Sequence, residues 1–159
     1  MSSAWVPAGE VIAIHLAAEK EGEMLPVDTV EAVAGKGLVG DRYFLGTGTY
    51  SAEPRPDRHV TLIESEALDA LARDYRIELQ AGASRRNITT RGVSLNHLVG
   101  REFTVGSIRL RGIKLCEPCN HLEAITGLEV RPGLVHRGGL RCEILDGGEI
   151  SVGDSIQPA

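Results

Sequence analysis

Apolar and polar residues alternate over several short stretches of the chain, which is the pattern of half-buried β-strands. Residues 10–16 (EVIAIHL) and 28–35 (DTVEAVAG) are two such stretches, and the polar segment EKEGEMLP between them predicts a loop. Residues 59–64 (HVTLIE) alternate as well, with Val60 and Leu62 on one face. These patterns predict three strands in the first half of the chain.

The hydrophobic period changes at residue 65. From there to residue 75 the apolar residues recur at the spacing of a helix, at Ala67, Leu68, Leu71, Ala72 and Tyr75. Residues 65–75 are therefore predicted to form a short amphipathic helix. It is the one clear helix that the pattern predicts.

Two hairpins are predicted in the second half of the chain. Residues 101–115 would turn at Gly106-Ser107, which suits a type II′ turn. The alternation slips at Gly112, and a glycine at such a slip predicts a β-bulge that re-aims the residues after it, beginning with Cys116. Residues 140–156 predict a second hairpin, with its turn at Asp146-Gly147-Gly148.

Many short strands around one helix predict a mostly β fold, a small β-barrel with helical decorations. The 159 residues and the 42% hydrophobic content fit one globular domain, and the 19 glycines suit many tight turns. The longest irregular stretch, residues 35–58, is rich in glycine, proline and threonine. Such a stretch is typical of a mobile lid.

The net charge of −5 lacks the basic footprint that an overall nucleic-acid-binding surface needs. No apolar run approaches the roughly 20 residues of a membrane span, and the first residues show no secretory signal. Three cysteines do not make a disulfide framework. We therefore expect a cytoplasmic protein with reduced thiols and without a nucleic-acid or membrane partner, whose oligomeric state the sequence does not predict.

Two of the three cysteines stand close together in KLCEPCNHLE, residues 114–123. A structural zinc site needs about four nitrogen or sulfur ligands, which Cys116, Cys119 and His121 would share with Cys142 or His136. In a thioredoxin-like dithiol the CxxC motif stands at the start of a helix in a βαβ unit, whereas the residues on either side of this motif predict a hairpin. The remaining alternative is that these cysteines are small apolar core residues.

The three cysteines have different expected roles. Cys142 lies on the apolar phase of a predicted strand, which indicates a core residue. Pro118 fixes its own φ and donates no backbone hydrogen bond, so the chain leaves the sheet before Cys119. A thiol in such a loop is accessible, as nucleophiles and metal ligands must be, and Cys119 is therefore the functional candidate. For Cys116 both roles remain open.

A cluster of arginines indicates a second candidate site. The segment SRRNITTRG, residues 84–92, combines arginines with other hydrogen-bonding residues: Arg85, Arg86 and Arg91 with Asn87, Thr89 and Thr90. Guanidinium groups bind phosphate through parallel hydrogen bonds, although the same pattern also fits a solvated strand edge. The segment VHRGGLR adds His136, Arg137 and Arg141, with two glycines that would allow close approach to a ligand.

The order of five segments resembles one known family. They are GDRYF, RHVTLIESEAL, RRNITTRGVSLNHLVGREFTVGSIRL, LCEPCNHLE and HRGGLRCEILDGGEISVGDSI. Together they resemble stand-alone MOSC domains, relatives of the C-terminal domain of molybdenum cofactor sulfurase. The resemblance runs from about Gly9 to Ile156, so it implies a single MOSC domain over residues 1–159 with a strongly twisted β-barrel.

The resemblance also implies a cofactor and its site residues. The signature cysteine of the family corresponds to Cys119, which would be the catalytic residue and the thiolate ligand of molybdenum. The cofactor-contact segment corresponds to Arg85, Arg86 and Asn87. Many members carry Gly-Glu-Asn there, whereas Arg-x-Asn in other members matches better. The full candidate set for binding the molybdenum cofactor, a molybdopterin, is Arg85, Arg86, Asn87, Thr89, Thr90, His121 and Arg137. Family descriptions also name pyridoxal phosphate, which we regard as a label inherited from a separate desulfurase domain.

Three functional hypotheses follow. The first is a molybdenum-dependent reductase of N-hydroxylated compounds, which acts on a small-molecule substrate and receives electrons from a partner protein. The second is a sulfur carrier or cofactor-delivery module, in which Cys119 holds a persulfide and the partner is a cofactor-biosynthesis protein. The third is a non-catalytic metal-binding module built from Cys116, Cys119 and His121. The remaining alternative is a β-barrel without bound metal.

Overall fold

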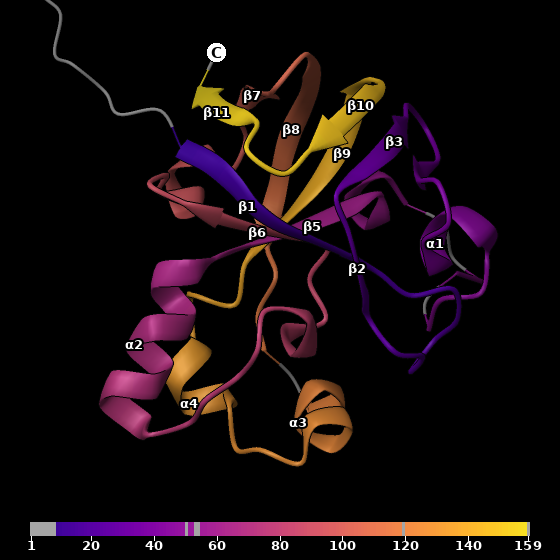
Figure 1. Ribbon diagram of the computed structural model, residues 1–159. Coiled ribbons are helices and arrows are strands. Elements are labelled where there is room, and N and C mark those ends of the chain that lie inside the picture. Colours follow the sequence, from indigo (N-terminus) through magenta and orange to yellow (C-terminus); the bar gives the residue numbers. More distant parts are fainter. Residues whose placement is uncertain (1–8, 50, 53–54, 119, 159) are drawn as a thin grey trace, which may run out of the picture.

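The computed structural model of the chain describes residues 9–49, 51–52, 55–118 and 120–158, and at residues 120 and 121 it describes the backbone only. Its main feature is a closed, twisted β-barrel (Figure 1). Around the barrel, seven strands of the described residues pair in the order β1 (Gly9–Leu16), β6 (Ile88–Arg91), β5 (Val60–Glu64), β9 (Leu140–Asp146), β8 (Ile108–Leu115), β7 (Glu102–Val105) and β11 (Ser155–Pro158). Pairing of β11 with β1 closes the ring.

Strand periodicity builds the interior of this barrel, as the sequence predicts. Val60 and Leu62 point inward together and are 1% and 0% exposed. Phe103, Leu110 and Ile144 from neighbouring strands complete the same apolar cluster. Among the described strands, β5 and β6 are the parallel pair of the barrel, and the other neighbours run antiparallel.

Helices cover one end of the barrel (Figure 1). They are α2 (Ser65–Tyr75), α3 (Asn120–Thr126) and α4 (Arg131–Leu134). The described residues also include the 3-10 turns η1 (Pro56–Arg58), η2 (Gly82–Ser84) and η3 (Leu95–Leu98). The predicted helix 65–75 is confirmed at both ends. Ile63 on the outer face of β5 packs with Leu71 of α2 and Leu134 of α4 in a second apolar cluster.

Tyr75 departs from the predicted stripe of α2. Its side chain is 49% exposed because the helix ends there, with Arg76 in the left-handed conformation. The ring lies against α4 at Gly133, where an added Cβ would come within 2.9 Å of it. Tyr75 therefore covers the edge of the second cluster instead of entering it.

The first predicted hairpin is confirmed, including its bulge. Strands β7 and β8 pair across Gly106-Ser107, and Gly106 has the positive φ of 59° that the first turn residue of type II′ requires. The register of β8 on β9 shifts between Gly112 and Lys114. This bulge brings the carbonyl of Leu98 against Gly112, a place that no side chain can share.

The second predicted hairpin is wrong. After Asp146 the chain leaves the barrel, and β10 (Gly148–Ser151) pairs with β3 (Thr29–Val33), which in turn pairs with β4 (Gly37–Leu38). The reason is burial, because Ile150 on β10 is 0% exposed and joins the barrel cluster. These strands form a separate three-stranded sheet beside the barrel (Figure 1).

Two segments that were predicted to be irregular contain short elements. The polar loop after β1 ends in β2 (Leu25–Val27), which pairs with β1. The glycine-rich stretch contains β4, α1 (Arg42–Leu45) and η1. Asp41 and Asp57 in this stretch are buried, at 1% and 6% exposure, so these parts of the stretch are packed against the barrel. None of the helices in the described part of the chain combines the length and apolar character that crossing a membrane takes.

We predict that Gly112→Ala lowers the free energy of unfolding by about 2–3 kcal/mol, because the new methyl group overlaps the Leu98 carbonyl. Urea unfolding would measure it. Arg111→Ala is the matched control on the same strand, since it removes an exposed ion pair with Glu102 that contributes less than about 1 kcal/mol. Equal effects of the two substitutions would contradict this account of the bulge.

Candidate functional site

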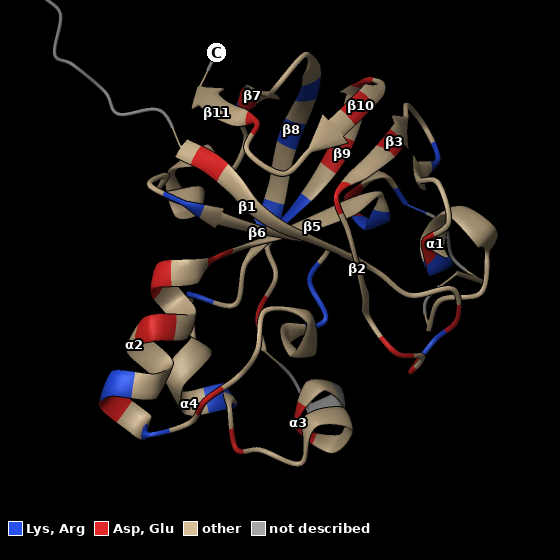
Figure 2. Cartoon of the chain, viewed as in Figure 1, with Lys and Arg blue, Asp and Glu red and all other residues tan. Residues whose placement is uncertain are grey.

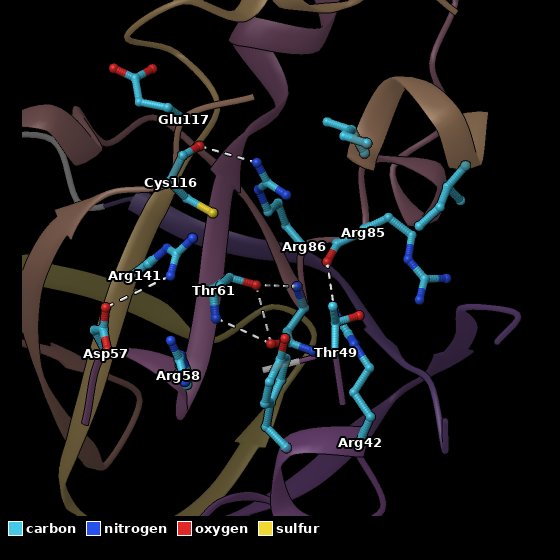
Figure 3. A pocket seen from close by; sticks show the side chains of 14 residues that line it. Arg42, Thr49, Asp57, Arg58, Thr61, Arg85, Arg86, Cys116, Glu117 and Arg141 are labelled. Carbon is cyan, nitrogen blue, oxygen red and sulfur yellow. Dashed lines mark hydrogen bonds and ion pairs between the residues drawn. The ribbon is translucent and has the colours of Figure 1, made fainter. Parts of the chain in front are cut away.

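A polar pocket opens where the helices meet the end of the barrel (Figure 3). Its empty volume is about 790 Å³, including space open to solvent. The wall combines segments that are far apart in sequence: Arg42, Tyr43, Thr49, Asp57, Arg58, Thr61, Arg85, Arg86, Asn87, Cys116, Glu117, Leu122, Ile125 and Arg141.

The pocket wall is cationic although the chain has a net charge of −5. Its charged members are five arginines and two carboxylates: Arg42, Arg58, Arg85, Arg86 and Arg141, with Asp57 and Glu117. Figure 2 shows acidic and basic residues mixed over α2 and the outer strands, with Lys and Arg segments also at the lower ends of β8 and β9. A recessed site lined by one sign of charge concentrates ligands of the opposite sign. The pocket is therefore suited to an anion.

Arg86 holds the pocket together from inside. It is 8% exposed, and its guanidinium donates to three backbone carbonyls: Gly138 at 2.7 Å, Cys116 at 3.1 Å and Ser84 at 3.2 Å. No carboxylate pairs with Arg86 among the described residues. Its charge is therefore solvated by carbonyl dipoles and adds to the positive potential of the pocket.

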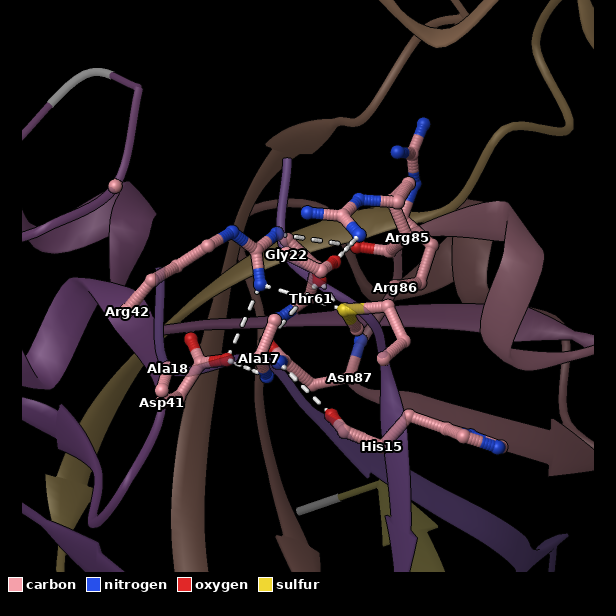
Figure 4. A network of polar contacts seen from close by, with 12 residues as sticks. His15, Ala17, Ala18, Gly22, Asp41, Arg42, Thr61, Arg85, Arg86 and Asn87 are labelled. Atoms are coloured by element: carbon pink, nitrogen blue, oxygen red, sulfur yellow. Dashed lines mark hydrogen bonds and ion pairs between the residues drawn. The ribbon is translucent and has the colours of Figure 1, made fainter. Parts of the chain in front are cut away.

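A second network fixes Arg42 and Arg85 at the opposite wall (Figure 4). The buried Asp41 carboxylate accepts from Arg42 Nη1 and from the Ala17 amide, both at 3.1 Å. Arg42 Nη2 donates to the Arg85 carbonyl at 3.3 Å, and Arg85 donates to the Gly22 carbonyl. Burial and the neighbouring Arg42 charge lower the pKa of Arg85, which indicates a guanidinium that an anionic ligand would stabilise.

Asn87 joins the two parallel strands next to the pocket. Its side-chain oxygen accepts from the Thr61 amide at 3.1 Å, and its side-chain nitrogen donates to the His15 carbonyl at 3.2 Å. Its own amide donates to the Thr61 carbonyl at 3.1 Å. The polar side chain of Asn87 is therefore hydrogen-bonded to the barrel backbone at the edge of the pocket.

Asp57 organises the cations on the remaining side. It accepts ion pairs from Arg55 and Lys114, both at 3.5 Å, and from Arg141 at 3.7 Å. Burial alone would lower the pKa of Arg141, but the adjacent Cys116 side chain and the Asp57 carboxylate together raise this pKa. Arg141 therefore stays cationic between the Cys116 sulfur and the Asp57 carboxylate.

Comparison with known proteins identifies this architecture. Residues 49–157 match the MOSC domain. The chain belongs to the MOSC domain family. No curated protein shows a significant match to it.

Solved structures show the same fold for this MOSC domain. YuaD from Bacillus subtilis has a TM-score of 0.79 and 14% identity, with 94% of each chain covered. YiiM from Geobacillus stearothermophilus has a TM-score of 0.72 and 18% identity, over 95% of this chain and 75% of that one. YiiM from Escherichia coli has a TM-score of 0.64 and 18% identity, over 94% and 69%. At these identities the likeness establishes the fold.

The pocket gathers some of the residues predicted from the sequence. Arg85, Arg86 and Asn87 line it, whereas Thr89 and Thr90 lie 1% and 0% exposed within β6, away from its wall. Strand β6 is not an edge strand, because β1 and β5 pair with it on either side, but Arg91 at its end is exposed.

The other predicted site residues lie elsewhere. Cys119 is outside the described residues, although Glu117 and Leu122 on either side of it line the pocket. His121 lies in α3, where its backbone alone is described. Arg137 is exposed and outside this pocket, within electrostatic reach of Glu64. Within the described part of the chain, no group of three or more histidine, cysteine or acidic residues is arranged to hold a metal ion.

Further residues of this MOSC domain reach the pocket from segments that pattern analysis did not assign to a site. Arg42 and Arg58 come from the stretch that was predicted to be irregular, together with Asp57. The sequence did carry a signal, since GDRYF and RPDR place arginines beside aspartates in that stretch. The pairing of Arg42 with Asp41 uses one of these neighbours directly.

We predict that Arg86→Ala lowers the free energy of unfolding by about 3 kcal/mol, because three buried carbonyls lose a charged donor. Arg86→Lys should recover little of this loss, since an ammonium group lacks the planar fork. Urea unfolding of both variants checks it. Arg85→Ala is the control and should change stability by less than about 1 kcal/mol. Similar losses for Arg85→Ala and Arg86→Ala would show that Arg86 has no special structural role.

Proposed function

We propose that this MOSC domain binds the molybdenum cofactor in the arginine-lined pocket, with Cys119 as the thiolate ligand of the metal. The observation that carries the proposal is the convergence of five arginines on one recess that Cys116 and Glu117 also line. The MOSC family is generally associated with this cofactor, which agrees with the chemistry of the wall.

The residues present fit such a group. A pterin cofactor of this kind ends in a phosphate, for which Arg85 and Arg42 offer guanidinium forks on one wall. Leu122 and Ile125 of α3 supply apolar surface for a flat ring. The soft thiolate at residue 119 suits molybdenum better than oxygen or nitrogen donors do.

The proposed reaction is the reduction of N-hydroxylated compounds. Two electrons and two protons convert a hydroxylamine, R–NHOH, into the amine R–NH2 and water. When bound, the cofactor would supply the two-electron chemistry. The residues of the chain would bind and orient the anionic cofactor, and the apolar α3 wall would exclude water from its ring.

Electrons would come from a partner protein in this proposal. The chain has three cysteines, fewer than the four thiolates that iron–sulfur clusters usually take. The second candidate, a sulfur carrier, would instead hold a labile sulfur on Cys119. A carrier of this kind would receive its sulfur from a desulfurase.

The first prediction from this proposal concerns the retention of molybdenum. Protein expressed in a host that makes the cofactor should contain molybdenum and an oxidisable fluorescent pterin, and Cys119→Ser should abolish both, since a hydroxyl is a poor substitute for a soft thiolate. Metal analysis and pterin fluorescence measure this. Cys142→Ser is the matched control, because Cys142 lies in the barrel cluster away from the pocket. Loss of the cofactor in Cys142→Ser but not in folded Cys119→Ser would reverse the assignment.

Our second prediction separates the reductase from the carrier. Cofactor-loaded protein should reduce a hydroxylamine or amidoxime with reduced viologen as donor, and Cys119→Ser should not. Amine formation and viologen oxidation are followed together and should agree at two electrons per amine. Absence of turnover in fully loaded protein, with a mass increase of one sulfur on Cys119 that a thiol reductant removes, would replace the reductase by the carrier.

A further inference from the structure

Cys116 and Cys142 are both buried, but they lie in different surroundings. Cys142 is 0% exposed and belongs to the apolar cluster inside the barrel. Cys116 is 6% exposed, belongs to neither apolar cluster and lines the pocket. Figure 3 shows its sulfur directed into the recess between Arg141 and Arg86. The packing of an ordinary core cysteine therefore describes Cys142 and not Cys116.

The backbone of Cys116 is fixed on both sides. Its amide donates to the Gly139 carbonyl at 2.7 Å, and its carbonyl accepts from Arg86 at 3.1 Å. Gly138 lies so close that an added Cβ would overlap the Cys116 carbonyl. A side chain whose backbone is held this firmly loses little freedom when it meets a ligand. Because Gly138 has no side chain, the Cys116 backbone can come this close to it.

The charges around this sulfur point toward an anionic ligand. Arg141 lies beside it, and the Nε atom of Arg141 is buried without a hydrogen-bond partner among the described residues. The Nη1 atom of Arg141 is 3.7 Å from Asp57, too long for a strong hydrogen bond. A bound anion would satisfy this donor. It would then lie in the recess that the Cys116 sulfur faces.

We propose that Cys116 is a second functional thiol of the pocket, which contacts small anionic ligands that carry a thiophilic centre. The arginines would select the ligand by charge, and the sulfur would meet its soft centre. If the proposed function holds, the inference deepens it, because Cys116 then gives the metal end of the cofactor a second sulfur neighbour in addition to Cys119.

Alkylation with a charged and a neutral reagent tests this without any cofactor. The Cys116 sulfur forms a bond to the methylene carbon of iodoacetate or iodoacetamide, iodide leaves, and the thiol proton passes to water. The ratio of the two rates cancels the ionisation of the thiol itself. Peptide mass spectrometry would follow Cys116 in Cys119→Ser protein, so that modification at the two positions cannot be confused.

In the folded protein the iodoacetate-to-iodoacetamide ratio at Cys116 should exceed the ratio in urea-unfolded protein by about tenfold, the lower range of electrostatic focusing. Inorganic phosphate should slow the reaction. Cys142 in the same molecules is the internal control and should react only after unfolding. Equal ratios in folded and unfolded protein, or reaction of Cys116 only together with Cys142, would make Cys116 a plain core cysteine and overturn the proposal.

Variants show which charge selects the anion. Arg141→Gln should bring the ratio close to that of unfolded protein, with unchanged Cys142 protection as proof of folding. Arg137→Gln is the matched control, because Arg137 is exposed and outside the pocket wall. An equal effect of the two variants would show that the overall charge of the protein sets the preference for iodoacetate, and it would refute an anion site at Cys116.

The cofactor provides a separate measurement. Cys116→Ser should lower the molybdenum content of protein from a cofactor-sufficient host several-fold, and wild-type content after Cys116→Ser would exclude a contact with the metal end. If the wild-type protein itself holds no molybdenum, the proposed function fails. The alkylation ratio still decides the role of Cys116 in that case.

Discussion

The buried guanidinium of Arg86 is the interaction on which the candidate site depends. It ties the carbonyls of Ser84, Cys116 and Gly138, so that segments next to β6, β8 and β9 meet at one point. Burying a charge without a carboxylate costs free energy, which three charge-assisted hydrogen bonds offset. Because carbonyl dipoles do not neutralise it, the same charge also polarises the pocket. One side chain therefore assembles the site and gives it an affinity for anions.

Carboxylates at the edge of the site decide what each cation can do. Asp41, at 1% exposure, holds Arg42 in place, and the buried Asp57 serves Arg141 together with two cations outside the pocket wall. Without these partners, like charges in one recess would repel each other by several kcal/mol at an effective dielectric constant of about 20. The pairing at Asp57 is long, so Arg141 keeps donor capacity for a ligand. The site thus balances its internal repulsion while it stays cationic as a whole.

Local pattern predicts those parts of the fold that short-range physics decides. The α2 helix, the β7–β8 hairpin and the bulge at Gly112 follow from period and residue type. The strand that pairs with β10 cannot be predicted in this way. The two glycines after Asp146 allow either a tight turn back onto β9 or a path away from it, and the burial of Ile150 and the pairing with β3 decide between these paths. The hydrophobic pattern does not predict strand β6 either, because its buried residues include polar ones that hydrogen-bond to neighbouring backbone, as Thr90 does to the Ile63 carbonyl. Arg42 and Arg58 could be found as charged neighbours of aspartate, but their convergence with Arg86 is tertiary.

The difference between the two described cysteines follows from strand geometry. Along β9, alternation puts Cys142 inside the barrel and Arg141 on the side of the pocket. Along β8, the bulge after Gly112 shifts the register by one residue, and the strand ends at Leu115, before its alternation can place Cys116. The position of Cys116 is then set by its hydrogen bonds to Gly139 and Arg86, which turn its sulfur toward Arg141. The register shift at Gly112 and these two hydrogen bonds together place Cys116 in a charged recess, outside the apolar interior that holds Cys142.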